Sequence, residues 1–196
     1  MQRPGTMVAD PIAEARDKFD IVSALEEARG RANPSREMVL DVLSLVLAGA
    51  RGGEKMSQQY SQQTGNPAFK QRWQKLSEQA QDHARIIEST IRALGGDPVR
   101  KSPPAQDLDR VVGCMLQVEA PGEAGDLVRL GNLAMLAHLC QRQCRGLGNV
   151  ARQIRDPGMA KLLWDASDIL EREEAAHVIW SSVTYDDQFM KVMAGV

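Results

Sequence analysis

The chain lacks the features that would mark a secreted, membrane-spanning or nucleic-acid-binding protein. Only three residues are cysteine, an odd number without the spacing of a disulfide framework, so free thiols in a reducing compartment are expected. Lysine and arginine (24) nearly balance aspartate and glutamate (26), which leaves no broad basic surface for phosphate groups. No stretch approaches about 18 uncharged apolar residues, and no signal-peptide core follows the first methionine. We therefore expect a cytoplasmic protein with no membrane span and no nucleic-acid partner.

Aromatic residues are scarce, at 4% of the chain, and the alternating pattern of half-buried strands is hard to find. The sequence has instead long runs rich in Ala, Leu, Gln, Glu, Arg and Met, with apolar residues at helical spacing. These runs predict an all-α protein. The expected helices, bounded by Pro, Gly and Asn, cover about 36–63, 67–94, 126–155 and 157–185, with a short helix at 108–118.

Two tight joints, at 66–67 and 156–157, divide the expected helices into two pairs. When the joints are superposed, glycines within 52–53 and 146–148 fall in the middle of both preceding helices. Two short-looped helix pairs joined by one long connection form the ferritin-like topology, although any two amphipathic hairpins of similar length share some of this pattern. Because glycine costs helix stability, these glycines indicate close approach of another helix or of a small ligand.

One stretch of the sequence carries a resemblance to a known family. Residues 49–98, GARGGEKMSQQYSQQTGNPAFKQRWQKLSEQAQDHARIIESTIRALGGDP, resemble the first half of rubrerythrin-type ferritin-like domains in spacing and character. The resemblance implies an up-down four-helix bundle whose first helix supplies a glutamate and whose second supplies a Glu-x-x-His pair. The last two helices repeat the scheme around two iron ions, with oxidoreductase chemistry. Glu54 and His83 match two of those ligand positions.

The sequence departs from this ligand pattern in the second and third helices. Ala80 stands three residues before His83, where the family has glutamate. The third helix has no carboxylate between 126 and 156, and Cys144 stands at the position equivalent to Glu54. An ordinary carboxylate-bridged di-iron site is therefore not expected.

The fourth helix keeps a ligand motif but shifts it. Glu174-x-x-His177 lies one helical turn farther from its joint than the family pattern, so that Leu170 and Glu173 occupy the expected positions. Through Glu173 and His177, this helix is expected to offer the core one carboxylate and one imidazole.

The surviving polar residues fall on the apolar seams of their helices. Stepping along each helix by alternating three and four residues places Glu54, His83, Glu173 and His177 on the face that forms the bundle core. A buried carboxylate or imidazole is costly unless it is paired, so we expect these four side chains to meet.

Two interpretations of this cluster remain open. In the first, it is a metal-free set of carboxylate–imidazole hydrogen bonds that specifies helix pairing, and the protein is a non-catalytic scaffold or binding module without the di-iron site. In the second, the protein binds iron or another divalent metal at a reduced site and handles metal or acts as an oxidoreductase, with a thiolate favouring zinc or copper. The candidate ligands are Glu54, His83, Cys144, Glu173, Glu174 and His177.

We expect the chain to comprise an N-terminal arm (1–34), a four-helix bundle (35–186) and a C-terminal tail (187–196). The arm contains an expected amphipathic helix at 11–30 that could cover the bundle or reach a neighbour. Ferritin-like bundles often pair along helix faces, so the resemblance implies a homodimer. The sequence identifies no small-molecule ligand and no substrate.

Overall fold

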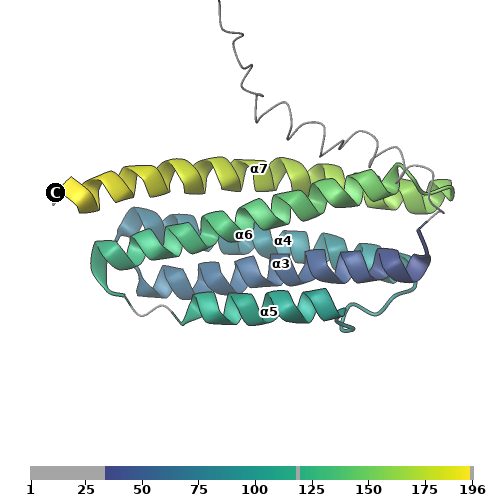
Figure 1. Cartoon of the computed structure of the whole chain (residues 1–196), viewed down its shortest axis with the longest axis horizontal. Coiled ribbons are helices and arrows are strands. Elements are labelled where there is room, and N and C mark those ends of the chain that lie inside the picture. The colour runs from purple at the N-terminus through teal and green to yellow at the C-terminus, as the bar shows by residue number, and fades with distance from the viewer. Residues whose placement is uncertain (1–33, 118–119, 195–196) are drawn as a thin grey trace, which may run out of the picture. The chain divides into compact units, whose positions relative to one another are not determined.

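The computed structural model describes residues 34–117 and 120–194, and the expected helix at 11–30 lies outside this part of the chain. The described residues form helices and no strand, as predicted. None of these helices is both long and apolar enough to cross a lipid bilayer. The helices, shown in Figure 1, are α3 (Arg36–Gln63), α4 (Pro67–Ala93), α5 (Pro103–Leu116), α6 (Gly122–Ala151) and α7 (Pro157–Ala194).

Both tight joints form as predicted because each combines a capping side chain with proline. The Asn66 side chain accepts hydrogen bonds from the first backbone N–H groups of α4, and the Asp156 carboxylate accepts one from the Met159 N–H. Pro67 and Pro157 occupy the first helical position, where the absent N–H costs nothing. The beginnings of α4 and α7 are thus encoded locally.

The other helix bounds differ from the prediction. The connection helix α5 begins at Pro103, five residues before the predicted start. The last helix continues to Ala194 instead of ending near Tyr185, so the predicted tail is helical over 187–194. No proline or glycine interrupts 186–194, and an i,i+4 ion pair between Lys191 and Asp187 supports the added turns.

The helices pack as two antiparallel hairpins, α3 with α4 and α6 with α7. Across the hairpins, α3 contacts α6 and α4 contacts α7, while α5 lies along α3 (Figure 1). The buried apolar residues form two clusters. One includes Leu43, Ile87 and Leu163, and the other is built around Tyr60 and Trp73. The polar side chains at 83, 174 and 177 occupy the core between them.

The helix glycines mark close approach of other helices. A Cβ atom at Gly52 would lie 2.8 Å from a methyl group of Val112 on α5, and one at Gly148 would lie 2.6 Å from the hydroxyl oxygen of Ser167 on α7. Both distances are too short for real Cβ contacts, so a larger residue at either position would force its neighbour to shift. Gly146, by contrast, has nothing within 4 Å of its Cβ position.

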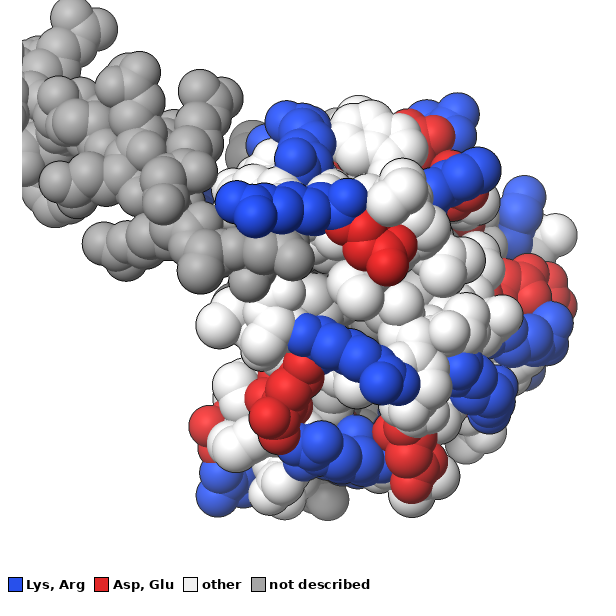
Figure 2. Space-filling view, turned by 90° about the vertical axis from the view of Figure 1, so that its right-hand side faces the viewer, with Lys and Arg blue, Asp and Glu red and all other residues white. Residues whose placement is uncertain are grey.

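The surface in Figure 2 carries basic and acidic side chains that alternate, without one broad basic area on the face shown. Many of them form short-range ion pairs along their own helix, such as Lys161 with Asp165 and Arg172 with Asp168. Such exposed pairs contribute little stability and serve mainly as a solvated surface.

Candidate functional site

Side chains from α4 and α7 form a continuous polar cluster in the core, which we call the His–Glu cluster: Gln79, His83, Glu173, Glu174 and His177. Glu174 is its centre. One carboxylate oxygen lies 3.1 Å from Nδ1 of His83 and the other lies 3.4 Å from Nδ1 of His177. The two imidazole rings are stacked with centroids 5.9 Å apart. Four of the six predicted ligands, from two different hairpins, therefore belong to this cluster.

The outer nitrogens of both imidazoles also have partners. Nε2 of His83 lies 2.6 Å from a carboxylate oxygen of Glu173, and Nε2 of His177 lies 3.1 Å from the side-chain carbonyl oxygen of Gln79. Gln79 was not predicted as a site residue, although its i,i+4 spacing from His83 places both on one face of α4. Every ring nitrogen of the cluster thus faces an oxygen atom.

The buried face of α7 agrees with the predicted seam at Leu170 and His177 but differs by one residue at the glutamate between them. Glu174 is 8% exposed, whereas the side chain of Glu173 is 43% exposed and reaches His83 from the edge of the core. The inward positions run Leu170, Glu174 and His177, a spacing of four and then three residues. The expectation that Glu173 is the core carboxylate is therefore wrong, and Glu174 takes that place.

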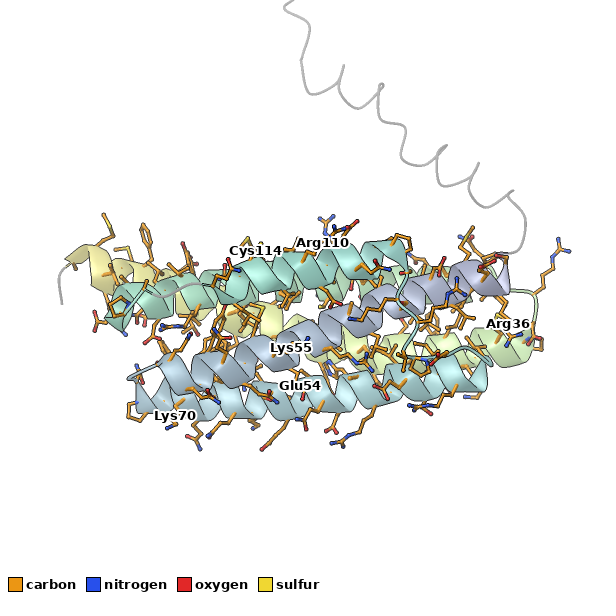
Figure 3. The ribbon with its side chains drawn as sticks, turned by 90° about the horizontal axis from the view of Figure 1, so that it is seen from below. Arg36, Glu54, Lys55, Lys70, Arg110 and Cys114 are labelled. Carbon is orange, nitrogen blue, oxygen red and sulfur yellow. The ribbon has the colours of Figure 1, made fainter. Side chains whose placement is uncertain are left out.

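Glu54 lies apart from the cluster. Its carboxylate accepts hydrogen bonds from the side chains of Gln58, at 3.1 Å, and Gln81, at 2.8 Å, where α3 runs beside α4 (Figure 3). No hydrogen bond among the described residues joins it to the imidazoles. The expected meeting of Glu54 with the other candidates is thus wrong, because the residues of α3 that face the core at this depth are Ala50 and Gly53.

Cys144 lies close to the cluster but as a buried thiol. Together with His83 and Glu174 it lines a void of about 10 Å³. Burial, and then the negative charges of Glu174 and Glu171, raise the pKa of Cys144 to about 12. Burial raises the pKa of the neighbouring Cys140 as well. At neutral pH both thiols are therefore protonated.

The charges within the cluster stabilise one another. Burial alone would lower the pKa of His83, but the hydrogen bonds and charges of Glu174 and Glu173 outweigh it and raise this pKa above 6.5. Burial would likewise raise the pKa of Glu174, but the partners His177 and His83 hold it below 4.5. His83 is therefore favoured as an imidazolium that donates from both nitrogens to carboxylates.

A cavity of about 30 Å³ adjoins the cluster, lined by Gly53, Ala80, Leu136, Cys140, Glu174 and His177. That volume corresponds to one or two water molecules. Organic ligands need on the order of 300 Å³ or more. Its walls contain small side chains on α3 and α4, among them Ala80, where the family resemblance would place a carboxylate.

The side chains do not fit a metal pair. Within the described part of the chain, no group of three or more His, Cys, Asp and Glu side chains converges in a way that could hold a metal ion. A di-iron site needs several carboxylates around two cations, and Ala50, Gly53 and Ala80 supply none. The imidazoles direct their nitrogens at protein oxygens instead.

A second buried polar group joins the end of α3 to the start of α6. Asp126 accepts hydrogen bonds from Thr64 at 2.9 Å and from Arg129 at 2.8 Å, and Arg129 is only 3% exposed. Sequence reasoning missed this pair, although the i,i+3 spacing of opposite charges is visible in the sequence. Because the guanidinium also donates to the backbone oxygen of Ala120, the pair fixes the chain where it enters α6.

Comparison of the chain with protein-family models, with curated proteins and with solved structures finds no significant match in any of the three. The functional interpretation therefore depends on the geometry of the core.

Proposed function

We propose that this chain is a metal-free ferritin-like bundle that acts as a non-catalytic scaffold or binding module, with the His–Glu cluster holding its two hairpins in register. The ferritin-like assignment is supported by the helix arrangement, in which α3–α4 and α6–α7 are joined by a long connection that contains α5. The resemblance of residues 49–98 agrees with it.

The main support for the proposal is the pair of hydrogen bonds that the ring nitrogens of His83 make. A histidine that binds metal must be neutral and must direct a lone pair at the cation. Here Glu174 and Glu173 face the two ring nitrogens at 3.1 and 2.6 Å and favour the protonated ring. With Ala80 in place of a carboxylate on the same helix, the buried charges of Glu174 and His83 neutralise each other without a cation.

Metal analysis tests the proposal. Protein purified without chelators or metal-affinity resin should be loaded anaerobically with Fe²⁺ or Zn²⁺, desalted and analysed by plasma mass spectrometry. The wild type and two variants, His83→Ala and the exposed control His138→Ala, should all retain far less than one metal ion per chain. Only His83→Ala should lower the melting temperature, because His138 lies outside the core.

A different result would favour the metal-binding alternative. Stoichiometric metal in the wild type and in His138→Ala, lost in His83→Ala and accompanied by a metal-dependent rise in melting temperature, would overturn the metal-free proposal. The site would then have to rearrange, since His83 would exchange a carboxylate partner for the cation.

A further inference from the structure

The C-terminal half of α7 is apolar on the side that faces away from the bundle. Ile179, Val183, Met190 and Met193 have 65, 64, 66 and 70% of their surface exposed. Their spacing of four, seven and three residues places them on one stripe of the helix, as in the seam of a coiled coil. We call these four residues the α7 stripe. It lies opposite the buried residues Leu170, Glu174 and His177.

The stripe borders a groove and continues beyond the bundle. Between α6 and α7 lies a groove of about 520 Å³, lined by Leu127, Val128, Gly131, Met135, Ser182 and Tyr185. The last turns of α7, which carry Phe189, Met190 and Met193, extend past the beginning of α6 (Figure 1). One end of the molecule therefore combines an apolar groove with a projecting apolar helix end.

We propose that a second copy of the chain covers this surface, with the two α7 helices antiparallel and the stripe of each lying against the stripe of the other. In this arrangement Met190 of one copy faces Ile179 of the second, and the two-fold axis repeats the contact with the roles exchanged. In the same register Val183 of one copy lies level with Asp186 of the other, beside the groove. The stripe is thus complementary to itself.

The area agrees with a dimer. The stripe, with Phe189 (42% exposed) and Met135 (56% exposed), forms a contiguous apolar area on the order of 500 Å² per copy, near the upper limit for monomeric proteins. A two-fold contact buries this area on both copies and adds a polar rim, so the total is on the order of 1,200 Å², where specific stable interfaces begin.

One charge opposes the association and provides a sharp test. Asp186 lines the groove and lies within the stripe, between Val183 and Met190. Near the two-fold axis of the antiparallel pair the two copies of Asp186 approach each other, and like charges repel. Removing this charge should therefore lower the dissociation constant of the dimer. A substitution that changed only the stability of the monomer would not have this effect.

Sedimentation velocity of the full chain over a wide concentration range tests the proposal. We expect a concentration-dependent dimer in the wild type. Its dissociation constant should rise at least tenfold in the double variant Ile179→Lys, Met190→Lys, remain unchanged in the control Val111→Lys on α5, and fall several-fold in Asp186→Asn. Val111 is a matched control because it is also an exposed apolar helix residue, at 48%.

Two results would overturn the proposal. If the wild-type chain stays monomeric at every concentration, the stripe is not a dimer interface and binds something else, such as residues 1–33 or a different protein. A dimer that persists in the double variant would place the interface elsewhere. Asp186→Asn, which keeps size and helix, remains informative if the double variant fails to fold.

Discussion

Replacing Glu174 with leucine tests whether the His–Glu cluster is a stabilising ion pair. The substitution keeps most of the side-chain volume and removes the carboxylate shared by His83 and His177. His83, which is 2% exposed, is left with Glu173, whose side chain is 43% exposed. Removing one partner of a buried pair typically costs about 3–5 kcal/mol, and because Glu173 remains we expect the lower end, about 3 kcal/mol at pH 6.

Urea unfolding followed by circular dichroism measures this loss, and a melting temperature lower by about 6–12 °C should accompany it. Glu171→Leu is the matched control on the same helix. Its carboxylate pairs with Arg145 at 2.9 Å on the surface, so its loss should cost less than about 1 kcal/mol. The double variant His83→Leu, Glu174→Leu should be more stable than the sum of its single changes, since it leaves no unpaired imidazolium.

Two outcomes would refute this reasoning. If Glu174→Leu cost no more than Glu171→Leu, the cluster would contribute nothing beyond a surface pair. If the two single changes were additive in the double variant, His83 and Glu174 would not be coupled.

Two further predictions concern pH and helix packing. The pKa of His83 is raised in the folded state, so its contribution to stability should be complete below pH 6.5 and be lost as the pH rises through the folded pKa. The pKa of Glu174 is lowered in the folded state, so its contribution should be complete above pH 4.5 and be lost as the pH falls through the folded pKa. The free energy of unfolding of the His83→Leu, Glu174→Leu variant, measured in urea across this pH range, should show neither of these two pH dependences. Gly148→Ala should cost about 1–3 kcal/mol because its Cβ would meet Ser167, whereas Gly146→Ala, in open space, should stabilise by about 0.5–1 kcal/mol, both measured by urea unfolding.

Helix bounds were predictable where the sequence contains a local signal. Ser35 caps α3, and Asn66 with Pro67 separates α3 from α4, so the predicted bounds 36–63 agree with the structure. The end of α7 was not predicted, because no capping residue, glycine or proline marks a helix end between Tyr185 and Ala194. The N-terminal arm lies outside the described residues, and its predicted helix stays a prediction.

The site was predictable only in part, because the spacing of apolar residues locates the buried face of a helix with an uncertainty of one residue. His83 and His177 are both buried as predicted. A helix advances about 100° per residue, so one wrong choice between a step of three and a step of four moves a side chain from the core to its edge. That error placed Glu173 inside and Glu174 outside. It also placed Glu54 in the core, since stepping four residues from Ala50 skips Gly53.

The position of the His–Glu cluster, between the two hairpins, suggests a structural reason for burying charged side chains there. The apolar seam of α4 consists of repeated Leu, Ile and Ala residues, so a shift of α7 by one helical turn, about 5.4 Å, would exchange one apolar contact for a similar one. The same shift would separate both Glu173 and Glu174 from His83 and leave a buried imidazolium without a carboxylate partner. Glu174 and His83 lie on different hairpins, 91 positions apart in the sequence. An ion pair between two otherwise degenerate surfaces therefore selects one register of the two hairpins, as the scaffold proposed for this chain requires.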